Sequence, residues 1–319
     1  MGAQYGNIKI DVLMYADDII IVTSCSNEAQ TMLNEISKIS DSHEIKFNPD
    51  KTNMMIFDKK DNDSNLQLLL CGKPIVHSNQ FKYLGTEITT NYSNIAHIEA
   101  RRKKVAISMK NLISSGIIND NMPRSAKMKL FKIYIKPLLA YGFEMLDLDE
   151  NELNLLKQIE GNVVKKLIGI PRRCHTTPLY GALDIESTRN TIMIQQMNFI
   201  IRIQKNEYLK KFLIESRKLQ NNSGMIGRML QINGWQQNVN LEKLNKLIME
   251  KQNELIQNKI DTYWFNEKVQ QVKKTLEIKN NFLKKNRLNE LLHYTTYQVT
   301  QRESVEIDEI TVIETNTTS

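Results

Sequence analysis

The chain has 319 residues, of which 41% are hydrophobic and 25% charged, and this composition excludes a wholly disordered, collagen-like or coiled-coil protein. The net charge is +7, and three cysteines without a CxxC pair exclude a disulfide framework and a cysteine-rich zinc site. No apolar run approaches the roughly 20 residues of a membrane span, and no signal pattern opens the chain. We therefore expect an intracellular protein without a membrane partner, for which the nucleus is one plausible location.

The charge is unevenly distributed. Residues 1–90 carry 8 basic and 12 acidic side chains, residues 91–220 carry 22 and 12, and residues 221–319 carry 13 and 12. An acidic first part and a basic middle would suit an enzyme of nucleic acids, which binds cations at one place and a polyanion at another. A solvated helical surface explains the same charges, and charge alone favours that explanation.

The first 90 residues have the pattern of short strands around one helix. Apolar residues from Ala29 to Ile39 recur at helical spacing, and Asn27 with Gln30 can cap that helix. β-branched runs bounded by turn residues predict the strands. The predicted strands are 7–13, 19–23, 44–47, 52–57, 66–70, 74–76 and 81–84.

From residue 92 the apolar spacing becomes helical. Asp149 and Glu152 form a capping-box pattern, and Pro137 should kink the helix that contains it. The predicted helices are 93–114, 122–141, 149–169, a short one from Thr177, 185–205 continuing to 219, 241–260 and 262–292. Residues 221–240 are predicted to be a linker and the tail from Thr300 to be disordered. The change of period predicts an α+β chain with domains at 1–91, 92–220 and 221–319.

The informative motif is Tyr15-Ala16-Asp17-Asp18, between two apolar runs that we expect to be buried strands of a hairpin. Two adjacent carboxylates repel each other unless cations neutralise them, and carboxylate oxygens suit Mg²⁺ or Mn²⁺. Asp is also a common turn residue, so the motif alone is moderate evidence for a metal site.

Several further blocks follow this motif in order, and together the chain resembles the reverse transcriptases of non-LTR (LINE-type) retrotransposons over roughly residues 8–205. Residues 10–21 resemble the catalytic palm hairpin, 45–55 the next palm block, 81–85 the primer-grip block, and 129–142 the helix of the downstream thumb region. The resemblance implies a partial polymerase palm, then an all-α thumb-like region and a helical C-terminal extension.

The resemblance implies roles for the hairpin. Asp17 would bind both catalytic metal ions, Mg²⁺ or Mn²⁺, and Asp18 would have a smaller metal role. Tyr15 and Ala16 would border the primer end and the incoming nucleotide. The implied reaction is DNA synthesis on an RNA template from a DNA primer and deoxynucleoside triphosphates.

The other blocks also receive roles from the resemblance. Lys51 would neutralise or protonate the pyrophosphate, with Asn48 fixing the turn before it. The residues that would hold the primer are Phe81, Tyr83, Leu84 and Gly85, and those that could contact backbone phosphates are Arg101, Arg102, Lys103 and Lys104.

Simpler explanations exist for each of these residues. Without the resemblance, Lys51 is a solvated lysine, and the alternation from Phe81 to Leu84 is that of any half-buried strand. The basic run 101–104 spans little more than one helical turn, so its members cannot all face one partner, and it could be a solvated face or a nuclear-import signal. His175 beside Cys174 has no second pair at zinc-ligand spacing.

The resemblance also lacks a part. The family places another metal-binding aspartate many tens of residues before the hairpin, whereas 16 residues precede Asp17, and Asp11 lies on the hairpin itself. We therefore expect a reverse-transcriptase fragment that does not polymerise alone. The alternatives are a nucleic-acid-binding protein without enzymatic activity and a decayed copy of the element that has no selected role.

Overall fold

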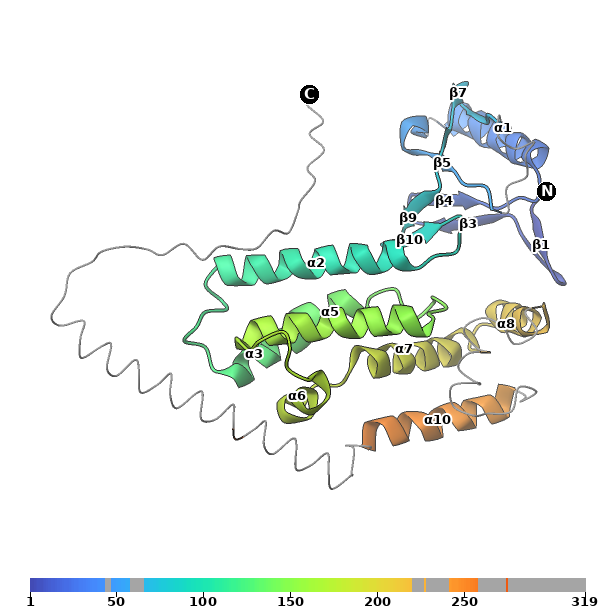
Figure 1. The fold of residues 1–319 in the computed structure, drawn as a ribbon. Helices are drawn as coiled ribbons and strands as arrows, with labels where there is room; N and C mark the ends of the chain where they lie inside the picture. Colours follow the sequence, from blue (N-terminus) through green and yellow to red (C-terminus); the bar gives the residue numbers. More distant parts are fainter. Residues whose placement is uncertain (44–46, 58–65, 220–226, 228–240, 258–273, 275–319) are drawn as a thin grey trace, which may run out of the picture.

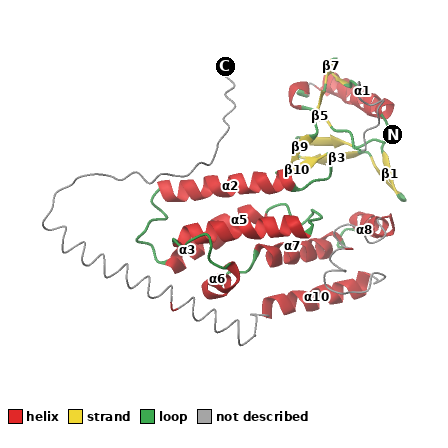
Figure 2. Ribbon diagram, in the orientation of Figure 1, coloured by secondary structure: helices red, strands yellow, loops and turns green. Residues whose placement is uncertain are grey.

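The computed structural model describes residues 1–43, 47–57, 66–219, 227, 241–257 and 274. Strands gather at one end of the molecule around the N-terminus, and helices extend from them in stacked layers (Figures 1 and 2). The predicted helix 262–292, the linker 221–240 and the tail lie essentially outside the described residues. No helix in the described residues is long and apolar enough to cross a membrane.

Every strand in the described part of the chain pairs with one other strand, so the strands form five separate two-stranded ribbons. Four ribbons are antiparallel (β1–β2, β3–β4, β6–β7, β9–β10), and β5–β8 is parallel. The strands are β1 Ala3–Tyr5, β2 Ile8–Ile10, β3 Val12–Tyr15, β4 Asp18–Ile21, β5 Asn53–Met54, β6 Leu69–Leu70, β7 Lys73–Pro74, β8 Val76–His77, β9 Gln80–Tyr83 and β10 Thr86–Thr89.

The predicted strand 7–13 is therefore two strands. It divides at Asp11, whose side chain accepts a 2.8 Å hydrogen bond from the N–H of Val12. On either side of this point β2 pairs with β1, and β3 pairs with β4. Helix α1 (Ser26–His43) confirms the apolar stripe and contributes Leu33 to a small core with Leu68, Leu70 and Ile75.

The helical prediction from residue 92 is confirmed in the described part of the chain. The helices are α2 Ile95–Ser114, α3 Arg124–Leu130, α4 Lys136–Ala140, α5 Glu150–Ile168, α6 Thr176–Leu183, α7 Thr188–Ile203, α8 Glu207–Leu219 and α10 Leu241–Gln257. Helix α5 begins with the predicted capping box, in which the Glu152 N–H donates to Asp149 and the Asp149 N–H donates to Glu152. It ends at Gly169, which has a φ of 68° and forms a left-handed C-cap.

The predicted helix 122–141 is interrupted where Pro137 requires it. Between α3 and α4 the segment Phe131–Ile135 forms a π-helical turn, which precedes Pro137 in the first turn of α4. Proline has no N–H and its ring collides with the carbonyl four residues earlier, so the regular α-helical ladder cannot continue through this point.

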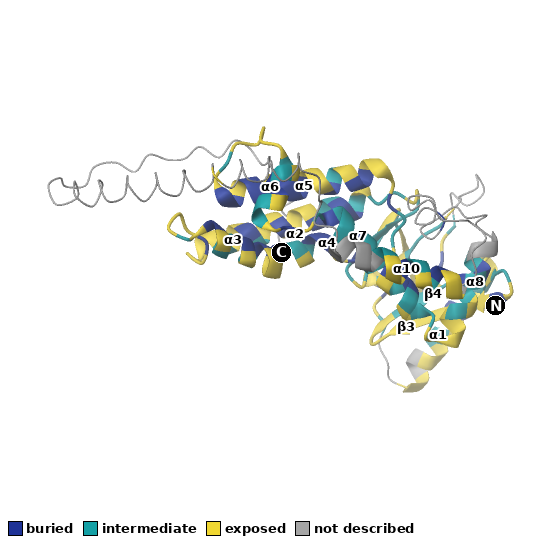
Figure 3. Cartoon of the chain, turned by 90° about the horizontal axis from the view of Figure 1, so that it is seen from below, coloured by how far each residue is buried: buried dark blue, intermediate teal, exposed yellow. Residues whose placement is uncertain are grey.

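The main hydrophobic core lies among the helices and extends from Ile98 in α2 to Ile192 in α7. A second cluster joins α7, α8 and α10 through Met197, Leu213 and Leu244. Figure 3 shows buried residues along several helices, α5 among them, while β3 is exposed. The first ribbon also reaches the helices, because the Tyr5 ring stacks on Phe212 of α8 at 4.9 Å.

The helical core contains a completely buried carboxylate. Glu160 is completely buried, accepts hydrogen bonds from the Tyr180 hydroxyl at 3.0 Å and from the Thr188 N–H at 2.8 Å, and joins α5 to α6 and α7. Burial raises the pKa of Glu160, although nearby Lys136 opposes this change. The neighbouring Gly161 lets α6 approach closely, since a Cβ atom there would lie 2.5 Å from the Thr176 methyl group.

Candidate functional site

The Tyr15–Asp18 motif forms the tip of the β3–β4 hairpin, as predicted. Tyr15 pairs with Asp18 across the ribbon, which leaves Ala16 and Asp17 as a two-residue loop. Ala16 has a φ of 52°, a left-handed conformation that tight hairpins require at the first loop residue. Both carboxylates are exposed at this tip. The hairpin therefore presents two adjacent carboxylates outside the protein core.

The expectation that the strands flanking the motif are buried is wrong for β3, whereas Ile19–Ile21 of β4 are partly buried. Leu13 is 47% exposed, Met14 68% and Tyr15 63%. The physical reason is the pairing, because β3 bonds with β4 alone in the described residues and no described layer covers its faces. The apolar side chains of β3 thus lie on an open ribbon.

The donor set at the tip suits a hard divalent cation only in part. Asp17 and Asp18 offer carboxylate oxygens, which are ligands for Mg²⁺ or Mn²⁺. The described residues, however, contain no group of three or more His, Cys, Asp or Glu side chains that could hold a metal ion. Two-metal sites hold ions about 4 Å apart, which requires more ligands than this pair supplies. The described residues therefore do not assemble a two-ion centre.

Asn48 fixes the turn before Lys51. Its side chain accepts a 3.0 Å hydrogen bond from the Asp50 N–H, and its carbonyl accepts from the Thr52 hydroxyl at 2.9 Å. The short 3₁₀ helix η1 (Pro49–Lys51) follows and leaves Lys51 exposed. No ion pair joins Lys51 to Asp17 or Asp18, all three of which the structure describes, so the role of Lys51 stays a prediction.

The proposed primer-holding residues lie on the β9–β10 hairpin. Tyr83 pairs with Thr86, and the loop residues Leu84 and Gly85 have φ values of 45° and 83°. Positive φ at both loop residues is the type I′ pattern. Phe81 and Tyr83 are half-buried, and Leu84 is 42% exposed. A half-buried hairpin explains the alternation of this block, and the primer-holding role stays a prediction.

Arg101 is buried, which argues against the phosphate contact predicted for it with the rest of the basic run. It is 2% exposed, its Nη2 donates a 2.8 Å hydrogen bond to the Gly85 carbonyl, and its guanidinium lies 5.1 Å from the centre of the Tyr141 ring. The Tyr141 hydroxyl in turn donates to the Leu84 carbonyl at 2.9 Å. Arg101 and Tyr141 therefore hold the exposed turn 84–85 against the helices.

The remaining members of the basic run are exposed. Arg102 forms a 2.6 Å ion pair with Glu99, three residues earlier on α2. The pKa of Lys104 is lowered, mainly by the positive charge of Arg101. Arg102, Lys103 and Lys104 thus stay candidates for phosphate contacts, while Arg101 is structural.

His97 completes this junction and was not predicted. It is fully buried, its Nδ1 accepts a 3.2 Å hydrogen bond from the Glu87 N–H, and its Nε2 lies 2.9 Å from the Tyr141 carbonyl. The ring is therefore neutral with its proton on Nε2, since Nδ1 acts as an acceptor. Burial is the main cause that lowers its pKa. We call His97, Arg101 and Tyr141, packed on the turn 84–85, the turn junction.

Comparison with known proteins identifies a family relationship for part of the chain. Residues 2–88 match the family model described as reverse transcriptase (RNA-dependent DNA polymerase). This matched segment ends inside β10, so it includes the Asp17–Asp18 hairpin, Lys51 and the turn 84–85. It supports a relationship between this segment and the RNA-directed DNA polymerases. No curated protein and no solved structure matches the chain.

Proposed function

We propose that this chain is part of an RNA-directed DNA polymerase of the non-LTR retrotransposon type. The observation that carries the proposal is the exposed Asp17–Asp18 pair at a hairpin tip within the segment that matches reverse transcriptases. The ancestral reaction is DNA synthesis on an RNA template, with Mg²⁺ or Mn²⁺ as cofactor. In this proposal residues 1–91 correspond to part of the palm and residues 92–220 to a thumb-like region.

The 319-residue chain by itself is proposed not to polymerise. The described residues provide two adjacent carboxylates and no third ligand, and loss of positioning at a reacting centre costs orders of magnitude in rate.

Primer extension tests this part of the proposal. The purified chain is given a primed RNA template, deoxynucleoside triphosphates and Mg²⁺ or Mn²⁺, and is compared with Asp17→Ala and with Asp11→Ala as a control on the same hairpin. We expect no extension from any of the three proteins. Extension by the wild type and by Asp11→Ala that disappears in Asp17→Ala would show that the chain is an active polymerase.

We also propose that residues 92–220 bind nucleic acid through backbone phosphates. Residues 91–220 carry 22 basic and 12 acidic side chains, and Lys103, which is described and exposed, has no carboxylate partner. Binding of a labelled single-stranded RNA should weaken as salt rises, because each phosphate contact releases counterions. Affinity that does not change with salt would contradict this function.

A further inference from the structure

A cavity of about 490 Å³ lies between one face of α5 and the segment that leads into α6. Three cations line it, Lys157 and Lys165 from α5 and Arg172 from the connecting segment, together with Asn154, Asn162 and Thr176. Its lining contains no Asp or Glu side chain. We call this cavity the α5 cleft.

The cations of the α5 cleft lack carboxylate partners. None of the three forms an ion pair among the described residues, whereas Arg189, from α7, forms a bidentate pair with Glu150 at the start of α5. A cavity lined by cations and no carboxylate attracts anions, because its walls focus a field of one sign. The cleft therefore suits a negatively charged occupant.

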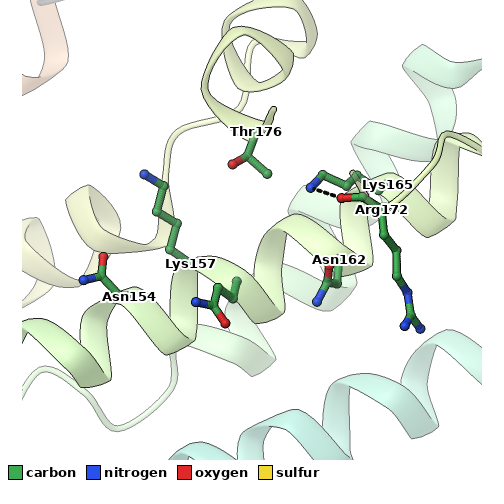
Figure 4. A pocket seen from close by; sticks show the side chains of 7 residues that line it. Asn154, Lys157, Asn162, Lys165, Arg172 and Thr176 are labelled. Carbon is green, nitrogen blue, oxygen red and sulfur yellow. Dashed lines mark hydrogen bonds between the residues drawn. The ribbon is translucent and has the colours of Figure 1, made fainter. Parts of the chain in front are cut away.

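Lys165 is the least exposed of the three cations. It is 8% exposed, and its Nζ donates a 2.8 Å hydrogen bond to the Arg172 carbonyl. An ammonium group has three N–H donors, so two remain after this bond. Figure 4 shows Lys165 joined to the Arg172 backbone, the Thr176 side chain between the ends of Lys157 and Lys165, and the Arg172 guanidinium at the far end of the row.

The shape of the cleft favours a chain of phosphates. Eight residues separate Lys157 from Lys165, which corresponds to about 12 Å along a helix at about 1.5 Å per residue. One strand of a duplex carries a phosphate about every 3.4 Å of axis, so the row is long enough for more than one phosphate. The amides of Asn154 and Asn162 add neutral N–H donors of the kind that contact phosphate oxygens.

The same lining disfavours recognition of bases. It contains no aromatic side chain, which is the usual platform on which proteins stack a base. Deepening the nucleic-acid binding proposed above, on which this inference rests, we propose that the α5 cleft binds the phosphodiester backbone of a nucleic-acid strand without reading its sequence.

The cations that are exposed can be replaced without disturbing the fold, and this allows a direct test. Lys157→Gln with Arg172→Gln removes two charges from the cleft, and Lys110→Gln with Lys129→Gln removes two charges from exposed sites on α2 and α3. Binding of a labelled single-stranded RNA of about 20 nucleotides is followed by fluorescence anisotropy over a salt series. Circular dichroism is used to check that both variants keep their helices.

The expected result is a difference between the two variants. The cleft variant should bind about tenfold more weakly at about 100 mM salt, with a salt slope smaller by about 1.4 for two lost contacts to a single strand, and equally for any sequence. The control variant should lose less than about threefold.

Equal losses of RNA affinity in both variants would overturn the proposed role of the α5 cleft while leaving nucleic-acid binding in place. Absence of binding by the wild type would instead overturn the proposed nucleic-acid function itself. Inorganic pyrophosphate and adenosine monophosphate serve as competitors. If the competitors displace RNA only as far as their ionic strength explains, the result supports a nucleic-acid strand as the ligand. If either competitor displaces RNA saturably at micromolar concentration, the cleft binds a free phosphate compound and the proposal of a bound strand is overturned.

Discussion

The strand-rich region and the helical region differ in how their residues are buried. The described residues up to 89 form five separate ribbons, helix α1 and a small core, and the apolar side chains of β3 are exposed. The helices from α2 to α7 share one continuous core, in which Phe131, Ile135 and Leu156 are completely buried. The segment that matches reverse transcriptases is thus less well packed than the helices that follow it. The Asp17–Asp18 motif and the main hydrophobic core therefore lie in different regions.

The largest expected effect comes from replacing a leucine by alanine in each of the two regions. Leu156→Ala in the helical core should reduce the free energy of unfolding by about 2–5 kcal/mol, because it creates a cavity. Leu13→Ala on the open ribbon should change it by less than about 0.5 kcal/mol. Chemical denaturation followed by circular dichroism measures both values. Similar losses at the two sites would show that β3 is covered in solution.

The turn junction offers the next largest effect. Arg101→Met leaves the Gly85 carbonyl without its charged donor and should cost about 2–3 kcal/mol of folding free energy. Arg102→Met, on the exposed side of α2, should cost less than about 0.5 kcal/mol.

RNA affinity distinguishes a structural Arg101 from a phosphate-binding one. At a temperature where Arg101→Met is still folded, its affinity for RNA should fall no more than that of Arg102→Met. A larger loss of affinity from Arg101→Met would restore the phosphate role that its burial argues against.

Removing a single hydroxyl should have a smaller effect. Tyr141→Phe keeps the ring beneath Arg101 but removes the hydrogen bond to the Leu84 carbonyl, and it should cost about 0.5–1.5 kcal/mol. Tyr134→Phe, at a tyrosine that is 54% exposed, provides the matched control. Equal stability of the two variants would mean that the turn 84–85 is held by Arg101 alone.

The smallest expected effect is a dependence of stability on pH. Burial lowers the pKa of His97 below its ordinary value of 6.5, and the charges of Arg101 and Lys104 act in the same direction while Glu87 opposes them. The unfolded chain therefore binds the proton more readily than the folded one. The contribution of His97 to stability is complete above pH 6.5 and is lost as the pH falls below that value through the folded pKa.

Denaturation curves of wild type and His97→Gln between about pH 5 and 8 isolate this contribution. The wild type should lose more stability than the variant as the pH falls, and His175→Gln, at an exposed histidine, should behave like the wild type. Glu160, whose pKa is raised, contributes with the opposite sign, but the comparison between variants cancels it. Parallel curves for wild type and His97→Gln would show that His97 is not protected from protons in the fold.

Local signals in the sequence predicted the elements well. The capping box of Asp149 and Glu152, the turn fixed by Asn48 and the hairpin at Asp17–Asp18 each depend on residues within a few positions of one another. These interactions form wherever the segment lies in the protein, and for this reason a sequence pattern can identify them.

Long-range packing explains what the sequence could not predict. Arg101 is buried because Gly85 and Tyr141, which are 16 and 40 positions away, contact it. No pattern within residues 101–104 indicates these two contacts. The α5 cleft likewise depends on Arg172 and Thr176 folding back onto α5, although the close approach at Gly161 leaves a weak signal. The split at Asp11 depends on partner choice, which alternation does not specify.

The π-helical turn 131–135 sets the direction in which the end of this helical segment faces. A π turn closes with i→i+5 hydrogen bonds and so takes up one residue more than an α turn. Tyr141 follows this turn and reaches the Leu84 carbonyl. A residue inserted or deleted after the π turn would rotate Tyr141 by about 100° and aim it away from the turn junction. The junction is thus encoded by the length of a helix as much as by the identity of its residues.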